Sequence, residues 1–127
     1  MRVLVIDDET AIRQGMAAVL ASWNCVAILA SSAAEALQQI AGQAPPHIII
    51  ADYRLRDNQT GAQAIEQIRQ QHGITIPALI ITGDTAPDRL LEAQASGHTL
   101  MHKPVQPGKL RAYLRRVQRT RPAYPDE

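Results

Sequence analysis

The chain has a single cysteine, no phenylalanine and four aromatic residues in all. One cysteine excludes an internal disulfide framework and a cysteine-rich zinc site. So few rings mean that the core has to be aliphatic and that stacking on nucleic-acid bases is nearly unavailable. The chain also lacks an apolar run of about 18 residues, the length that spans a bilayer. Because Asp7 and Asp8 come so early, the start does not resemble a secretory signal peptide, and we expect a cytoplasmic domain.

What the chain does contain is the composition of one ordinary domain. Of its 127 residues, 46% are hydrophobic and 20% are charged, which argues against disorder and low complexity. We predict a folded domain over residues 1–120 and a short tail over 121–127. The net charge of +1 is unevenly spread. Residues 1–108 carry seven basic and ten acidic side chains, whereas residues 109–127 carry six basic and two acidic ones.

Short apolar runs rich in β-branched residues recur along the chain and indicate strands. They are continuous rather than alternating, which is typical of strands covered on both faces in a parallel sheet. The runs are Val3–Ile6, Val26–Leu29, Ile48–Ala51, Ala78–Ile81 and a weaker fifth one at Thr99–His102.

Helical patterns lie between these runs. A capping box at Ser32–Glu35 opens a helix that ends near Ile40, and a second box at Thr85–Asp88 opens one that ends near Gly97. Apolar spacing predicts the other helices around Ile12–Leu20, over Gly61–Gln71 and around Leu110–Val117. Strands that alternate with helices predict an α/β fold, a single three-layer (βα)₅ doubly wound parallel sheet.

Polar side chains follow four of the predicted strands. Asp7 and Asp8 follow the first strand, and Asp52 follows the third. Thr82 ends the fourth strand and Lys103 ends the fifth. The carboxyl ends of parallel strands meet at the edge where α/β sheets bind ligands. One polar residue at a strand end is commonly structural, but four such groups at one edge indicate a functional site.

The chemistry of these residues favours a metal ion. Three carboxylates so close together disfavour one another's charged form, and a divalent cation relieves that conflict. Oxygen ligands without cysteine favour a hard ion, Mg²⁺ or Mn²⁺. A carboxylate beside such an ion can attack phosphorus and form an aspartyl-phosphate. That reaction needs charge neutralisation at the transferred oxygens, which the Lys103 ammonium and the Thr82 hydroxyl would supply.

These positions, with the proline after the lysine, carry a resemblance to a known family: Asp7, Asp8, Asp52, Thr82, Lys103 and Pro104. They resemble the receiver domain of two-component response regulators over about residues 1–120. The resemblance implies a flavodoxin-like fold with strand order 2-1-3-4-5. It implies that Asp52 accepts a phosphoryl group from a phosphohistidine on a histidine kinase or a histidine phosphotransfer domain. It also implies a domain that is no stand-alone enzyme, although it catalyses its own phosphorylation and dephosphorylation.

The resemblance implies a role for each metal-site residue. Asp8 and Asp52 would bind Mg²⁺ through their side chains, and Arg54 would bind it through its backbone carbonyl. Asp7 would orient water on the metal. The Arg54 side chain would either overhang the phosphoryl group and slow attack by water or lie solvated at the surface, and we leave these two alternatives open.

Signalling in the family depends on a switch at the ends of the last two strands. Thr82 and Lys103 would contact the phosphoryl group, and the Lys103–Pro104 peptide bond is usually cis in the family. Many receivers have an aromatic switch residue three positions before the lysine, where this chain has Leu100. That departure favours a phosphate sink, a relay or a regulator of its own kinase over a conventional transcriptional switch.

Four segments look like those of receivers at the C-terminus of hybrid sensor histidine kinases: Ala51–Leu55, the Thr60–Gly61 turn, Ile80–Pro87 and His102–Val105. The parent protein would then be a protein histidine kinase, unless the receiver is only a partner of one. A phosphorylation-independent interaction module is an alternative, although every pocket position is intact. A Mg²⁺-dependent aspartyl-phosphate phosphohydrolase is a weaker one, because it needs an acid where this chain has Arg54.

The basic end of the chain leaves a further question open. Arg111, Arg115 and Arg119 recur every four residues and form one stripe of a helix. A solvated helix face is the simpler interpretation, and electrostatic docking to an acidic partner is the main alternative. We expect no direct contact with nucleic acid, because no helix-turn-helix motif is present, and none with a membrane. A homodimer stays open.

Overall fold

The computed structural model describes residues 1–55, 59–72, 76–83 and 98–120. Three predictions lie outside these residues: the capping box at Thr85–Asp88, the helix end at Gly97 and the tail at 121–127.

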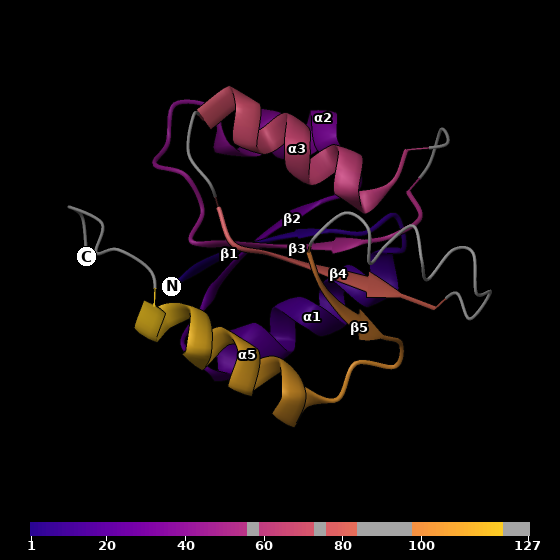
Figure 1. Cartoon of the computed structure of the whole chain (residues 1–127), viewed down its shortest axis with the longest axis vertical. Coiled ribbons are helices and arrows are strands. Elements are labelled where there is room, and N and C mark those ends of the chain that lie inside the picture. The colour runs from indigo at the N-terminus through magenta and orange to yellow at the C-terminus, as the bar shows by residue number, and fades with distance from the viewer. Residues whose placement is uncertain (56–58, 73–75, 84–97, 121–127) are drawn as a thin grey trace.

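The described residues form a five-stranded parallel sheet with the order β2-β1-β3-β4-β5, which confirms the prediction (Figure 1). The strands are β1 (Arg2–Ile6), β2 (Val26–Ala30), β3 (Ile48–Asp52), β4 (Ala78–Thr82) and β5 (Thr99–His102). Each lies within one residue of its apolar run, because a continuous run of β-branched residues defines a buried strand closely.

Helices cover both faces of this sheet. They are α1 (Thr10–Ser22), α2 (Ala33–Ile40), α3 (Gly61–His72) and α5 (Pro107–Thr120). The α1 and α5 helices lie on one face, and α2 and α3 lie on the other (Figure 1). In the described part of the chain, no helix has the length and apolar character needed to cross a membrane.

Alternate residues of the strands serve two separate cores. In β1, Leu4 and Ile6 face the α2 and α3 side, whereas Val3 and Val5 face the α1 and α5 side. Strands β3 and β4 are buried throughout, as predicted. The prediction of cover on both faces is wrong for β2, which is only partly buried because it is an edge of the sheet. The weaker fifth strand, β5, forms the other edge and is also only partly buried.

Two side-chain caps fix the starts of α2 and α3. The Ser32 hydroxyl accepts a hydrogen bond from the Glu35 N–H at 3.1 Å, which confirms the predicted cap. The Glu35 carboxylate reaches Ser31 instead of the cap residue. At α3, Thr60 and Gln63 form a reciprocal capping box that our sequence analysis missed. Its signal, a threonine three residues before a glutamine, was present in the sequence.

Candidate functional site

The register of the sheet brings the predicted site residues to one edge. Asp52 pairs with Ile81 at the end of β3 and β4, and Thr82 pairs with His102 one step further along. Asp7 follows the last residue of β1, and its N–H donates to the carbonyl of Ala30 at 3.1 Å. The predicted meeting of strand ends is therefore confirmed.

Three carboxylates meet at this edge. Oxygen atoms of Asp7, Asp8 and Asp52 lie within 4.8 Å of one another. Asp7 and Asp52 are buried, and Asp8 is half-buried. One oxygen of Asp7 accepts the Glu9 N–H at 2.9 Å, so the start of α1 fixes the orientation of this carboxylate.

Lys103 is the cation of the cluster. Its Nζ donates to Oδ2 of Asp52 at 3.0 Å and lies 3.6 Å from Oδ2 of Asp7. The backbone N–H of Lys103 donates to the carbonyl of Thr82 at 2.8 Å, which holds the lysine at the end of β4. The Lys103–Pro104 peptide bond is cis, as the resemblance implied.

The environment shifts the pKa values of this ion pair. Burial raises the pKa of Asp52, and the charge of Asp7 adds to the rise, while the hydrogen bond from Lys103 opposes it. Burial by itself would lower the pKa of Lys103, but the hydrogen bond with Asp52 and the surrounding carboxylates outweigh it and raise this pKa. The surroundings therefore stabilise the charged ammonium of Lys103 and destabilise the ionised carboxylate of Asp52.

A pocket of about 480 Å³ opens onto this ion pair. Its lining residues are Asp8, Glu9, Asp52, Arg54, Thr82, Gly83 and Lys103. The Thr82 side chain is buried, whereas Arg54 is exposed at the rim. No role was predicted for Glu9 or Gly83, although both immediately follow predicted site residues.

The sequence places Gly61 in a turn with Thr60 but does not show why a glycine is needed there. The N–H of Gly61 donates to the carbonyl of Tyr53 at 2.8 Å, which closes the turn after β3. A Cβ atom built on Gly61 would lie 2.4 Å from the carbonyl oxygen of Asp52. Only glycine allows α3 to start this close to the strand end that carries Asp52.

Leu100 occupies the predicted switch position on β5. It is partly buried against the core on the α3 side of the sheet. Its neighbour Met101 joins the core on the α5 side, as the alternation of a strand requires.

The donor set of the pocket fits a hard divalent cation. Three carboxylates provide oxygen ligands at spacings that one ion can bridge. Asp8 is the most exposed of the three, and Asp52 is buried beside it. A cation would also relieve the cost of ionised Asp52.

Comparisons with known sequences assign this chain to a family. Residues 3–115 match the family described as response regulator receiver domain. Response regulator RR06 of Streptococcus pneumoniae serotype 2 is 30% identical over 99 residues, which cover 77% of this chain and 45% of that protein. Response regulator MprA of Mycobacterium avium is 30% identical over 125 residues, which cover 96% and 53%. The chain thus spans about half the length of these curated relatives.

Several solved structures have the same fold as this chain. The chemotaxis protein CheY4 of Vibrio cholerae is 31% identical with a TM-score of 0.76, over 91% of this chain and 97% of that one. A two-component response regulator from Clostridium difficile shares the fold, with 23% identity and a TM-score of 0.81 over 94% and 97%. The chain belongs to the response regulator receiver domain family.

Proposed function

We propose that residues 1–120 are a phosphoacceptor receiver of a two-component phosphorelay. A carboxylate oxygen of Asp52 attacks the phosphorus of a partner's phosphohistidine; the P–N bond breaks as the new P–O bond forms. The observation that carries this proposal is the placement of Asp52 beside two other carboxylates, with Lys103 at 3.0 Å, in an open pocket. That set supplies a nucleophile, a cation site and a fixed positive charge.

The three carboxylates, Lys103 and Thr82 each have a proposed role. Asp8 and Asp52 would hold Mg²⁺, with Mn²⁺ as a substitute, and Asp7 would orient water on the ion. The ion would supply neutralising charge to the phosphoryl oxygens. Lys103 shifts from its ion pair toward a phosphoryl oxygen. The Thr82 hydroxyl donates a hydrogen bond to another phosphoryl oxygen, and the two contacts together report the phosphorylated state.

Arg54 has two proposed functions, one for its backbone and one for its side chain. Its backbone forms a bridge with Thr60 that uses the carbonyl of Tyr53 and the N–H of Leu55. We propose that the Arg54 backbone carbonyl would bind the metal ion. The side chain lines the rim of the pocket, which agrees with a position over the phosphoryl group.

An apolar groove of about 620 Å³ adjoins the pocket, and we propose that it binds the phosphodonor protein. It runs between α1 and the start of α5 and is lined mainly by Ile12, Met16, Val19, Pro104, Val105 and Leu110. Gly83 and Lys103 line both the groove and the pocket, so the two are continuous. A helix of a kinase or phosphotransfer domain in this groove would bring its phosphohistidine to Asp52.

Membership of a hybrid sensor histidine kinase stays a prediction, as does a cytoplasmic location. The relatives RR06 and MprA are named response regulators, and about half of each lies beyond the matched segment. The boundaries of the gene test the prediction directly. A histidine kinase core encoded in frame before residue 1 would support it.

Phosphorylation itself is tested with acetyl phosphate and Mg²⁺. We expect intact-protein mass spectrometry to show the addition of one phosphoryl group and Asp52→Asn to abolish it. Glu66→Gln is the matched control, because it makes the same carboxylate-to-amide change at an exposed position of α3. An unchanged mass shift in Asp52→Asn would refute the assignment of the nucleophile.

The groove is tested separately with an autophosphorylated histidine kinase as donor. Gly15 lies in α1 at the groove, and a Cβ atom built on it meets nothing within 4 Å. We expect Gly15→Arg to slow phosphotransfer from the kinase while labelling by acetyl phosphate is unchanged. Ala21→Arg adds the same charge at an exposed position of α1 outside the groove, and we expect it to have little effect.

A further inference from the structure

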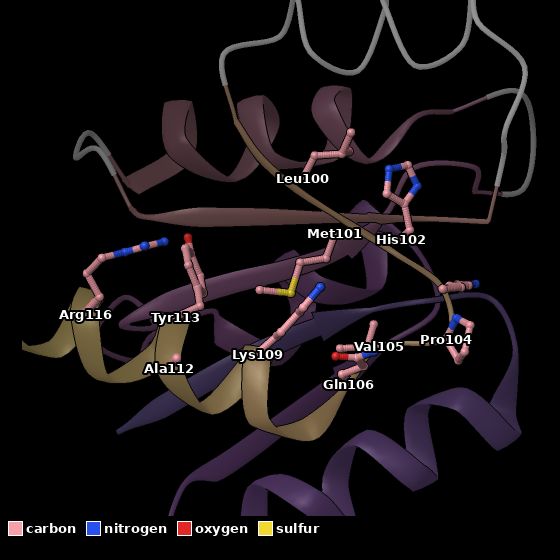
Figure 2. Close-up of a pocket in the computed structure, with 11 residues that line it drawn as sticks. Leu100, Met101, His102, Pro104, Val105, Gln106, Lys109, Ala112, Tyr113 and Arg116 are labelled. Carbon is pink, nitrogen blue, oxygen red and sulfur yellow. The ribbon is translucent and has the colours of Figure 1, made fainter.

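The two edge strands of the sheet differ in how they are protected from pairing with another strand. Charged side chains beside an edge strand oppose such pairing. Near β5, Lys109 and Arg116 of α5 line a hollow of about 500 Å³ together with side chains of the strand, such as Met101 (Figure 2). The other edge strand, β2, contains no charged residue and no proline, and it pairs with β1 in continuous register without a bulge. Within the described chain, β2 itself therefore carries none of the features that usually prevent such pairing.

The low charge extends to the helices beside β2. The stretch 14–51 covers most of α1, all of β2 and α2 and most of β3, and Glu35 is its only Asp, Glu, Lys or Arg residue. In the whole chain, by comparison, 20% of the residues are charged. The carboxylate of Glu35 is engaged within its own chain, because it accepts the hydroxyl of Ser31 at 2.8 Å. A second copy of this surface can therefore approach without repulsion between like charges, whereas a strongly charged partner would find no matching opposite charges.

The backbone of β2 turns every second residue away from the sheet. The N–H of Val26 donates to the carbonyl of Met1, just before β1, at 2.9 Å. In a parallel pair, alternate residues direct their N–H and C=O groups to the neighbouring strand, so Ala27 and Leu29 direct theirs outward. In the described part of the chain, no strand pairs with β2 on that outer side. These outward groups of Ala27 and Leu29 are here called the open edge of β2.

The N–H groups that flank the open edge are already engaged. The N–H of Cys25 donates to a carbonyl of α1 at 3.0 Å, and the N–H of Ser31 donates to the carboxylate of Glu35 at 3.3 Å. A strand that adds to this edge can therefore receive hydrogen bonds from Ala27 and Leu29 but not from the outward residues on either side. The open edge is short, and both of its ends are defined.

We propose that the chain forms a symmetric dimer by antiparallel pairing of β2 with β2 of a second copy. The two-fold axis passes beside Ile28, so Ala27 of each copy lies opposite Leu29 of the other, and each of these two pairs exchanges two main-chain hydrogen bonds. A register shifted by two residues would need the N–H of Cys25 or of Ser31, which is already engaged. Only the proposed register uses all the outward donors of the open edge.

A side chain beside the open edge also fits this occupant. Among the described residues, Val26 is the one large hydrophobic side chain that is mostly exposed, at 60%. In the proposed register it lies opposite Ala30 of the second copy and is partly covered by the added strand. A second copy fits better than a strand of a different protein, because it brings the same uncharged flanks and donors at the same spacing. The carboxyl ends of the two joined sheets point in opposite directions, so both acidic pockets stay open.

Sedimentation equilibrium of the wild type, from about 5 to about 500 µM, measures the proposed dimer. We expect reversible dimerisation. Ala27→Pro removes an outward N–H but no hydrogen bond to β1, so each dimer loses two of its hydrogen bonds and is expected to be at least about tenfold weaker. Urea unfolding of the same variant verifies that it is folded.

A charge placed on the edge is the second perturbation. Val26→Lys puts an ammonium beside the open edge, and we expect it to be monomeric at concentrations where the wild type is a dimer. Gln67→Lys is the matched control, because it adds the same charge at an exposed position of α3 and is expected to stay dimeric. Labelling by acetyl phosphate reports separately on the pocket and is expected to be normal in all these variants.

Cysteine cross-linking tests the register in a Cys25→Ser background, which removes the single native thiol. In Ile28→Cys the two thiols lie directly opposite each other, with Cα atoms about 4.5 Å apart, so we expect mild oxidation to link the dimer. Val26→Cys is the control; its thiols lie roughly 13 Å apart along the strands and are expected to stay unlinked, although this position is more exposed. A wild type that is monomeric throughout, a dimer that both Ala27→Pro and Val26→Lys leave intact, or equal cross-linking at the two positions would each overturn the proposal.

Discussion

The acidic pocket and the exposed basic side of α5 are both clusters of charge, but they are built in different ways. The basic side, here called the α5 basic face, consists of Lys109, Arg111, Arg115, Arg116 and Arg119. The pocket gathers Asp7, Asp52 and Lys103 from strand ends that are far apart in the sequence. Its charges have opposite signs, lie within 3.6 Å of a partner and are mostly buried. The α5 basic face takes five charges of one sign from 14 consecutive residues and exposes all of them.

This difference shows which of the two sites depends on the fold. The pocket exists only when the sheet is in register, so a defect in its scaffold affects both stability and chemistry. The α5 basic face needs only a helix docked by its apolar side, so its charges can change without disturbing the core. Substitutions at matched positions in the two regions can test this contrast.

We expect the largest contrast from the same glycine-to-alanine change in the two regions. Gly61→Ala places a Cβ atom 2.4 Å from the carbonyl oxygen of Asp52 and is expected to destabilise the protein by about 3 kcal/mol. Gly108→Ala in α5 meets nothing within 4 Å and is expected to stabilise it by roughly 0.5–1 kcal/mol. The midpoint of urea unfolding measures both. Changes of equal sign would mean that the turn beneath the pocket adapts easily.

Mg²⁺ is expected to stabilise the protein through the acidic pocket and not through the α5 basic face. At about 100 times its dissociation constant, Mg²⁺ stabilises the wild type by up to about 2.7 kcal/mol, because it binds the folded pocket and not the unfolded chain. Asp8→Asn removes a ligand, and we expect it to lose most of this gain. The double variant with Arg115→Gln and Arg119→Gln is the control and is expected to keep it. A full magnesium response in Asp8→Asn would contradict the ligand assignment.

The sequence predicted the positions of the strands well, because a continuous apolar run such as Ile48–Ala51 favours a strand that is buried on both faces. It also predicted the meeting of Asp7 and Lys103, because parallel strands leave their carboxyl ends at one edge. It could not reveal why position 61 needs glycine, because that need arises from the distance between α3 and β3.

The other end of the sheet shows the same limit. The Nδ1 atom of His47 accepts the N–H of Arg2 at 2.8 Å, and the Arg2 guanidinium donates to the carbonyl of Ala44 at 2.7 Å. These contacts join residues more than 40 positions apart, so no local pattern indicates them.

The inner side of α5 should be more sensitive to substitution than its basic face. The buried Tyr113 hydroxyl donates to the carbonyl of Ala78 at 3.1 Å, and Tyr113→Phe is expected to cost about 1 kcal/mol at neutral pH. Burial raises the pKa of Tyr113 above its ordinary 10.0, so the folded state holds this proton more tightly than the unfolded state. The stability that Tyr113 provides therefore falls as the pH rises above about 10. Urea unfolding from pH 8 to 11 should show a wild-type decline that is shallower in Tyr113→Phe; parallel curves would contradict this.

The smallest effect is expected on the basic face itself. Arg115 has like charges four residues away on both sides, at Arg111 and Arg119, so Arg115→Gln is expected to stabilise the protein by about 0.5 kcal/mol at low salt. The gain should shrink in about 0.5 M NaCl, because salt screens exposed charges. Arg119→Gln is the comparison; it relieves less repulsion and loses a favourable charge in the last turn, so its gain should be smaller. If Arg115→Gln instead destabilises the protein at low salt, other groups of the chain already compensate the charge of Arg115, and the predicted repulsion along α5 is refuted.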